Sequence, residues 1–99
     1  MAKFFLTNKA VNDLTNIWNY TFDQWSEDQA DRYYLEIISR CDDIAQNPKI
    51  GKNYEGVSHE LFGLPSGRHI IFYRKISASK IEITRILHQQ MDLKRRILE

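Results

Sequence analysis

Two arginines and two histidines are the side chains whose types and spacing could do chemistry in this sequence. Arg68 and His69 begin one predicted strand, and Arg85 and His88 end the next. If these strands pair as a hairpin, the start of the first lies beside the end of the second, which brings Arg68 near Arg85 or His88. Guanidinium groups can bind a phosphate, and an imidazole can act as acid or base when a 2′-hydroxyl attacks and cleaves RNA.

The same residues also have a structural interpretation, in which Arg68 and Arg85 form ion pairs that serve only the fold. Acids of the first predicted helix or of the C-terminal tail, such as Asp13 and Asp92, are available as partners. Because neighbouring residues on a strand point to opposite faces, the four side chains are not expected to converge on one site. We therefore favour the structural interpretation and keep RNA cleavage by Arg68, Arg85 and His88 as the alternative.

Neither a metal site nor a cofactor site is indicated. His59, His69 and His88 lack the close-spaced ligands that a zinc site needs, and Cys41 is the only cysteine. Cys41 falls on the apolar face of a predicted helix, where a thiol behaves as a small hydrophobic side chain. The four glycines never form a glycine-rich turn that opens a helix, so a phosphate-binding loop is missing. We expect no metal and no cofactor.

Two predicted helices precede the strands. Apolar residues step by three and four along residues 10–25, as one face of a helix requires. Ser26 followed by Gln29 is typical of a capping box and starts a second helix, whose apolar stripe covers residues 30–45. This helix ends at Asn47-Pro48, because proline disfavours helical geometry in the residue before it. The two helices and the tight corner between them form a helical hairpin.

Segments rich in β-branched and aromatic residues follow a connector and predict a meander of three strands. These strands are expected at residues 59–64, 68–74 and 80–87, with a turn at Pro65-Ser66-Gly67. Residues 3–6 can add a fourth strand, and residues 92–98 a short C-terminal helix. The predicted fold is therefore a two-layer α+β domain, in which the N-terminal helical hairpin packs on a three- to four-stranded antiparallel sheet.

Length and composition fit one globular domain over residues 1–99. The chain has 99 residues, 42% of them hydrophobic and 27% charged, and two separate cores could not both be buried in so short a chain. No run of about 20 apolar residues could span a membrane, and the start of the chain is too short for a secretion signal. We expect a cytoplasmic protein with no membrane contact.

Charge is polarised along the chain, although the net charge is only +1. Residues 1–62 hold 6 basic and 10 acidic side chains, whereas residues 63–99 hold 8 basic and 3 acidic ones. A basic C-terminal third suits a face that meets nucleic acid or an acidic protein surface. The alternative is ordinary solvated charge that happens to cluster.

Two strands carry apolar side chains at consecutive positions, Phe4-Phe5 and residues 70–73. Both faces of these strands are therefore hydrophobic. If the helices cover only one face, the other leaves an exposed apolar patch, which usually marks a partner site. Alternatively, the chain covers the second face with its own C-terminal tail.

Four blocks of the sequence, in order, resemble the ParE-type toxins of the RelE/ParE toxin–antitoxin superfamily, the plasmid stabilisation system toxins. The blocks are residues 10–21 (AVNDL then IWNYT), 25–30 (WSEDQA), 47–51 (NPKIG) and 67–74 (GRHIIFYR), the last followed by ITRILH at 83–88 and Met91-Asp92. Together they span nearly the whole chain. The resemblance implies a helical hairpin on an antiparallel sheet and a cognate ParD-like antitoxin whose C-terminal segment wraps and silences the toxin.

The resemblance also implies a target. The tail after His88 has no tyrosine, and its Leu-His-x-x-Met-Asp run resembles ParE, a DNA gyrase inhibitor that arrests bacterial growth and is not known as a nuclease. This favours a non-enzyme. RelE-type relatives, which are ribosome-dependent mRNA endoribonucleases, are the alternative, with Arg68, Arg85 and His88 as catalytic residues. A third possibility is an inert relative that only pairs with an antitoxin.

Candidate residues for binding the antitoxin and for binding the target follow from these expectations. Aromatic side chains are the usual hot spots of protein interfaces, so we predict antitoxin binding at Trp18, Trp25 and Tyr34. The basic C-terminal end is predicted to bind the target and carry toxicity through Arg85, Met91, Lys94, Arg95 and Arg96. Direct sequence-specific binding to nucleic acid is not expected.

Overall fold

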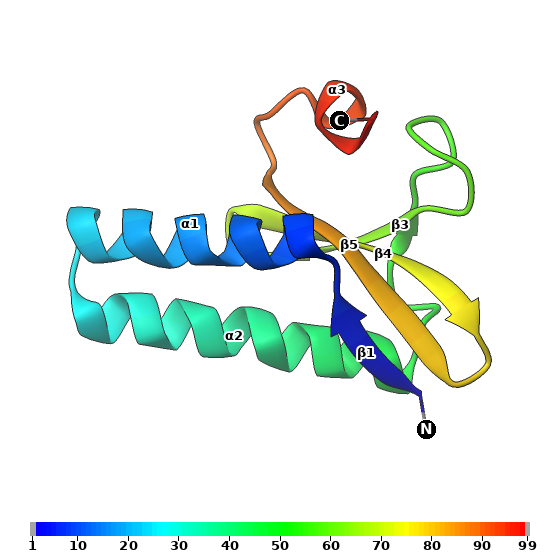
Figure 1. Ribbon diagram of the computed structural model, residues 1–99, viewed down its shortest axis with the longest axis horizontal. Coiled ribbons are helices and arrows are strands. Elements are labelled where there is room, and N and C mark those ends of the chain that lie inside the picture. Colours follow the sequence, from blue (N-terminus) through cyan, green and yellow to red (C-terminus); the bar gives the residue numbers. More distant parts are fainter. Residues whose placement is uncertain (1, 99) are drawn as a thin grey trace.

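Three helices and five strands make up the part of the chain that the structure describes. The computed structural model describes residues 2–98, and the side chains of Lys94 and Leu98 lie outside that description. In chain order the elements are β1 (Lys3–Leu6), α1 (Asn8–Gln24), α2 (Glu27–Gln46), β2 (Lys52–Asn53), β3 (Phe62–Ser66), β4 (His69–Ser77), β5 (Lys80–His88) and α3 (Leu93–Leu98). Figure 1 shows α1 and α2 as a hairpin along one side of the sheet. The predicted α+β class is confirmed.

The two long helices begin where a side chain caps them. The hydroxyl of Thr7 accepts a hydrogen bond at 3.1 Å from the backbone N–H three residues on, which starts α1. Ser26 caps α2 in the same way, accepting from the N–H of Gln29 at 3.1 Å, so the predicted serine cap is confirmed. Asn47 terminates α2 directly before Pro48, also as predicted.

The strands form one mixed sheet in the order β1-β5-β4-β3-β2. β3, β4 and β5 make the predicted antiparallel meander, and β2 adds a short strand beside β3. β1 instead runs parallel to β5, with Lys3 opposite Lys80 and Leu6 opposite Ile83, so the sheet is not purely antiparallel as we expected. Side chains alternate in the same way in parallel and antiparallel strands, so the sequence of residues 3–6 carries no signal for its pairing direction.

The boundaries of β3 also differ from the prediction. It spans Phe62–Ser66 instead of residues 59–64, and residues 67–68 alone make the turn into β4. We ended the predicted strand before Pro65, because proline cannot donate a hydrogen bond within a sheet. It is tolerated here because β2 pairs only with the first two residues of β3, which leaves Pro65 on an open edge.

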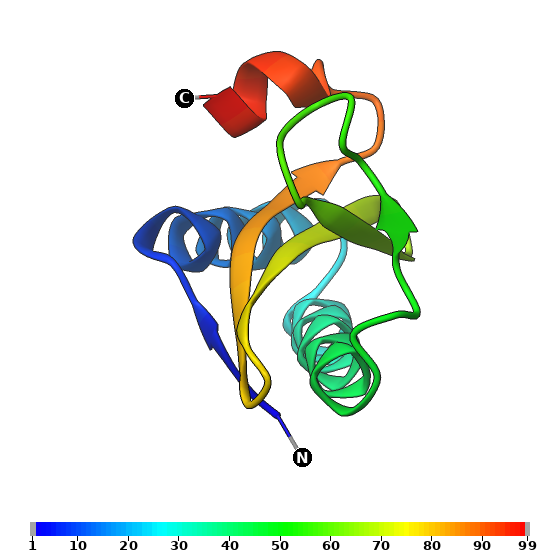
Figure 2. The ribbon, with the colours of Figure 1, turned by 90° about the vertical axis from the view of Figure 1, so that its right-hand side faces the viewer.

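Apolar side chains cover both faces of the sheet. The larger cluster lies between the helical hairpin and the sheet and includes Ile37, Ile71 and Tyr73. A smaller cluster on the other face consists of Leu61, Ile70, Phe72 and Leu87, with Tyr54, Val57, Leu93 and Ile97 packed against it. Figure 2 shows α3 and the loop before β3 across the sheet from the helices. The chain's own tail therefore covers the second face, which was one of the two alternatives.

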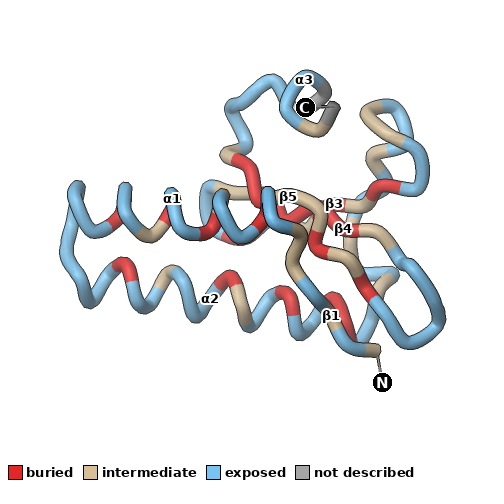
Figure 3. Tube along the Cα trace, in the orientation of Figure 1, coloured by how far each residue is buried: buried red, intermediate tan, exposed pale blue. Residues whose placement is uncertain are grey.

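Cys41 belongs to the larger cluster, as predicted. It is fully buried on the face of α2 that packs against the sheet, and Figure 3 shows such buried positions recurring along both long helices. Burial raises the pKa of its thiol to about 12. The thiol therefore stays protonated and acts as an apolar side chain.

Candidate functional site

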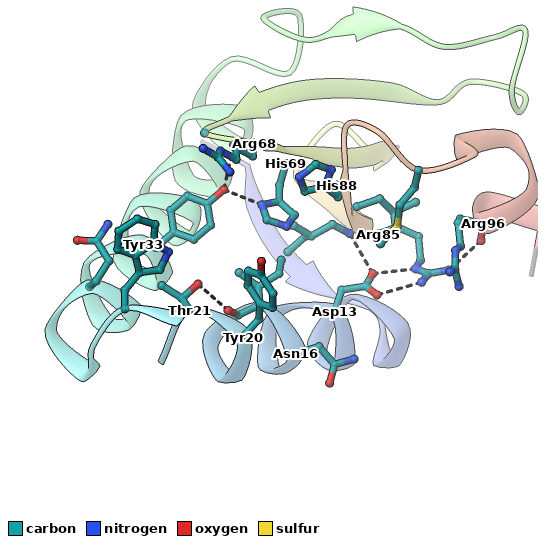
Figure 4. Close-up of a pocket in the computed structure, with 17 residues that line it drawn as sticks. Asp13, Asn16, Tyr20, Thr21, Tyr33, Arg68, His69, Arg85, His88 and Arg96 are labelled. Atoms are coloured by element: carbon teal, nitrogen blue, oxygen red, sulfur yellow. Dashed lines mark hydrogen bonds and ion pairs between the residues drawn. The ribbon is translucent and has the colours of Figure 1, made fainter. Parts of the chain in front are cut away.

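A cleft of about 770 Å³ opens between α1, the β3–β4 turn, the end of β5 and the C-terminal tail. Figure 4 shows side chains from these segments directed into it. Among the described residues that line it, three arginines, Arg68, Arg85 and Arg96, stand against one carboxylate, Asp13. The lining is therefore electropositive, and its volume lies within the range of small-ligand sites.

The two arginines and two histidines that the sequence singled out all line this cleft, so the expectation that they would not converge is wrong. Arg68 lies outside the strands, in a two-residue turn with Gly67, and strand alternation does not apply to it. His69 and His88 are opposite each other in the β4–β5 register, and their rings meet edge to face with centroids 5.3 Å apart. Hairpin pairing thus brings the two strand ends together, as predicted.

Arg85 forms an ion pair with Asp13 of α1, which confirms the structural interpretation for this residue. Its Nε and Nη2 donate to the two carboxylate oxygens at 2.8 and 2.9 Å, and the Arg85 and Asp13 side chains are 11% and 13% exposed. The backbone N–H of Ile86 donates to the same carboxylate at 3.1 Å, and Nη1 of Arg85 donates to the carbonyl of Arg96 at 2.8 Å. Asp13 thus joins α1 to β5 and, through Arg85, to α3.

A β-bulge lies where β5 becomes an edge of the sheet. Thr84 has no opposite residue in the β4–β5 register, and β1 pairs only with residues 80–83. Beyond residue 83, β1 no longer pairs with β5. The hydroxyl of Thr7 instead donates a hydrogen bond to the carbonyl of Thr84 at 2.8 Å. A bulge changes which residues of a strand share a face. The bulge lies before Arg85, so the alternation from Arg85 to His88 is intact, and Arg85 reaches Asp13 from the edge of the sheet.

Tyr33 of α2 anchors the turn that carries Arg68. Its hydroxyl accepts a hydrogen bond from the N–H of Arg68 at 3.2 Å and lies 2.6 Å from Nδ1 of His69. Gly67 has a φ of 59°, and a β-carbon there would lie 2.7 Å from the Tyr33 ring, so this close approach requires glycine. Sequence reasoning counted Tyr33 as part of an apolar stripe and missed this role. The sequence did offer one signal for this role, which is that the hydroxyl of a buried tyrosine needs a hydrogen-bond partner.

The two histidines offer hydrogen-bonding groups to the cleft. Burial, reinforced by the nearby His88, lowers the pKa of His69 to about 4, so the His69 ring is neutral at pH 7. A group this difficult to protonate is a poor general acid near neutral pH. Nδ1 of His88 accepts from the N–H of Gln90 at 3.1 Å, which leaves Nε2 of His88 as the N–H donor.

A second hollow, of about 630 Å³, lies between α1, α2 and the end of β1. We call it the hairpin groove; Trp18 and Tyr34, two of the predicted antitoxin-binding residues, line it. Trp18 is half-buried there, donates its indole N–H to Asp31 at 3.0 Å and stacks on Phe22 with ring centroids 5.3 Å apart. Trp25 lies at the electropositive cleft instead, with 74% of its surface exposed. The three aromatic residues therefore occupy two different surfaces.

Only some of the residues predicted to bind the target lie together in the structure. Met91 and Arg96 line the electropositive cleft with Arg85, and Met91 is 41% exposed. Arg95 is exposed on α3 and does not line the cleft. The side chain of Lys94 lies outside the described residues, so its predicted role has no structural counterpart here.

Within the described residues, no three His, Cys, Asp or Glu side chains are grouped so that they could hold a metal ion. No helix in that part of the chain is both long and apolar enough to cross a membrane. The cleft itself offers guanidinium and imidazole donors beside exposed aromatic rings. Such a combination suits an anionic ligand or an acidic surface.

Comparison with known proteins gives consistent matches over nearly the whole chain. Residues 4–93 match the family described as ParE toxin of type II toxin-antitoxin system, parDE. The chain is 34% identical to Toxin ParE1 of Mycobacterium tuberculosis over 96 residues, covering 97% of this chain and 98% of that protein. It is also 34% identical to Toxin ParE1 of Caulobacter vibrioides, covering 93% and 94%. A solved structure titled "Chromosomal ParDE TA system from P. aeruginosa" shares the fold, with a TM-score of 0.76 at 19% identity over 89% of this chain and 96% of that one.

Proposed function

The chain belongs to the ParE toxin family of type II toxin–antitoxin systems, and from that premise we propose that it inhibits DNA gyrase in the cytoplasm and is neutralised by a cognate ParD-like antitoxin. The state of Arg85 is the observation that favours gyrase over RNA as the target. Its guanidinium already binds the Asp13 carboxylate through two hydrogen bonds. A ribosome-dependent nuclease would need that cation to contact the RNA. We therefore propose a toxin that is not an enzyme and keep the RNase as the second candidate.

We place antitoxin binding at the hairpin groove. The groove is apolar along Val11, Leu14 and Ile38, and Trp18 and Tyr34 supply the aromatic surface that interface hot spots favour. Tyr34 is 40% and Val11 48% exposed, so apolar area is available for a partner to bury. A wrapping C-terminal segment of the antitoxin could continue from this groove to Trp25 at the other surface.

Antitoxin in excess should sharply raise the melting temperature of the toxin, because a partner that binds only the folded state stabilises it by about 2.7 kcal/mol at 100 times its Kd. Trp18→Ala should weaken this binding at least about tenfold and reduce the shift in melting temperature at equal antitoxin concentration. Isothermal titration and thermal unfolding measure the two effects. The matched control is Ile76→Ala, which removes an apolar side chain that is 52% exposed in β4 and does not line the groove. Equal binding by both variants would refute the placement.

For target binding we propose the basic face of α3 together with Met91. Arg95 and Arg96 are exposed and follow one another on this short helix. Arg85 is held by Asp13, so we propose that it contributes by fixing α3 through the Arg96 carbonyl. Because that contact uses a backbone oxygen, changing the charge of the Arg96 side chain leaves the acceptor in place.

Charge reversal at Arg95 and Arg96 together should weaken toxicity about tenfold or more, equivalent to about 1.4 kcal/mol of lost binding free energy. Stability should change by only about 0.5 kcal/mol per site, because both residues are on the surface. Growth after induction measures toxicity, and urea unfolding measures stability. The same reversal at Arg32 and Arg40, which are exposed on α2, is the control and should leave toxicity unchanged. Full toxicity of the α3 variant would exclude this face as the target contact.

A further inference from the structure

We propose that the electropositive cleft is a binding site for a nucleoside phosphate, with the phosphate at Arg68 and His88 and the base stacked at the cleft mouth. The source is either a free nucleotide or one nucleotide of a single strand, which share this chemistry. Such binding goes beyond the proposed inhibition of gyrase and does not depend on it. Charge, hydrogen-bond donors, aromatic surface and size each point to this class of ligand.

Charge and donors together require an anion that is rich in acceptor atoms. The described side chains of the lining carry three guanidinium groups and a single carboxylate, and that carboxylate is already bound by Arg85. Arg68 is exposed at the rim, and its backbone is held because its N–H donates to the Tyr33 hydroxyl. Nδ1 of His88 accepts from the backbone N–H of Gln90, so the N–H that His88 offers is at Nε2. Phosphate oxygens accept hydrogen bonds from such donors.

Aromatic rings at the mouth of the cleft provide a face for a base. Tyr20 and Trp25 of the α1 segment both line it, and they are 66% and 74% exposed. Rings that are this exposed beside cations match the stacking surfaces that proteins present to unpaired bases. An acidic side chain of a protein partner would use the cations and leave these rings unused.

The size of the site favours one small ligand. The cleft measures about 770 Å³ and is walled on one side by α1 and on the other by the β3–β4 turn and the end of β5. Sites for single small molecules have volumes of roughly 300–1,000 Å³ and few, well-placed polar groups. The Tyr33–His69 contact at 2.6 Å and the Gly67 turn hold one wall in place, so the phosphate end of the site is formed before a ligand arrives.

Calorimetric titration of the full-length purified chain tests this inference with adenosine monophosphate, inorganic phosphate, adenosine and a single-stranded deoxyoligonucleotide. Adenosine monophosphate should bind more tightly than either of its parts, because it alone reaches both the cations and the rings. Arg68→Gln should weaken its binding at least about tenfold. Trp25→Ala should weaken the binding of adenosine monophosphate and leave that of inorganic phosphate unchanged. A tighter oligonucleotide identifies a strand as the source, and an equal or weaker one identifies a free nucleotide; both support the site.

Arg40→Gln is the matched control, because Arg40 is an exposed arginine of α2 outside the cleft lining, and it should bind as the parent chain does. Circular dichroism checks that Arg68→Gln is folded, which is expected for an exposed turn residue. Three results would overturn the inference: no binding of adenosine monophosphate, equal loss with Arg40→Gln, or tighter Arg68-dependent binding of a glutamate-rich peptide. The last would assign the cleft to an acidic protein segment.

Discussion

Replacing Asp13 with alanine should lower the free energy of unfolding by about 3 kcal/mol. Removing one member of a buried ion pair costs roughly 3–5 kcal/mol, because the remaining charge stays desolvated without its partner. The low end applies because Asp13 and Arg85 keep 13% and 11% of their side-chain surface exposed. The variant also leaves the N–H of Ile86 without the carboxylate that now accepts from it at 3.1 Å. Urea unfolding monitored by circular dichroism measures the loss.

Asp23→Ala is the control, because Asp23 is an exposed acid of the same helix, and it should cost no more than about 0.5 kcal/mol. A double-mutant cycle with Arg85→Ala isolates the pair. The double variant should be less destabilised than the two single changes added together, because neither charge is then left alone. Strict additivity, or an Asp13→Ala variant as stable as Asp23→Ala, would show that the ion pair does not hold α1 to β5.

The helical part of the fold was predictable because its signals are local. The N-cap of α2 joins the side chain of Ser26 to the backbone N–H of Gln29, only three residues further along the chain. The proline that ends α2 acts on its immediate neighbour. The Asp13–Arg85 pair was one of the contacts that we expected between the arginines and the acids of the first helix or the C-terminal tail.

The site was harder to predict because its geometry depends on register. The sequence predicted the hairpin that brings His69 to His88, but placed Arg68 on a strand, where alternation would turn it away from its neighbour. The proline inside β3 led us to end that strand two residues too early, and Arg85 reaches Asp13 from the edge of the sheet, a contact that alternation along a strand does not describe. Neither feature has a sequence signal that is independent of the pairing itself. The anchoring role of Tyr33 is likewise a contact between distant segments.

Inhibition of gyrase without nuclease activity is the second large effect that we expect. If toxicity comes from gyrase, induction should arrest replication and leave cleaved, protein-linked DNA. Cleavage of RNA instead needs one group at the 2′-hydroxyl proton and another at the leaving oxygen. His69, with a pKa of about 4, is poorly suited to donate a proton to the leaving oxygen near neutral pH, and Arg85 is held by Asp13. His88→Ala should therefore change toxicity by no more than about twofold, equivalent to about 0.4 kcal/mol, because His88 is not part of the target face proposed on α3.

The most direct measurement incubates the purified toxin with gyrase, supercoiled plasmid and ATP, and in parallel with translating ribosomes and message. We predict linear plasmid DNA after protease treatment, to nearly the same extent with His88→Ala, and intact message on the ribosomes. The variant with reversed charge at Arg95 and Arg96 should give much less linear DNA. Message cleavage on ribosomes that is abolished by His88→Ala, with no linear plasmid in the gyrase reaction, would contradict this account and identify a ribosome-dependent endoribonuclease.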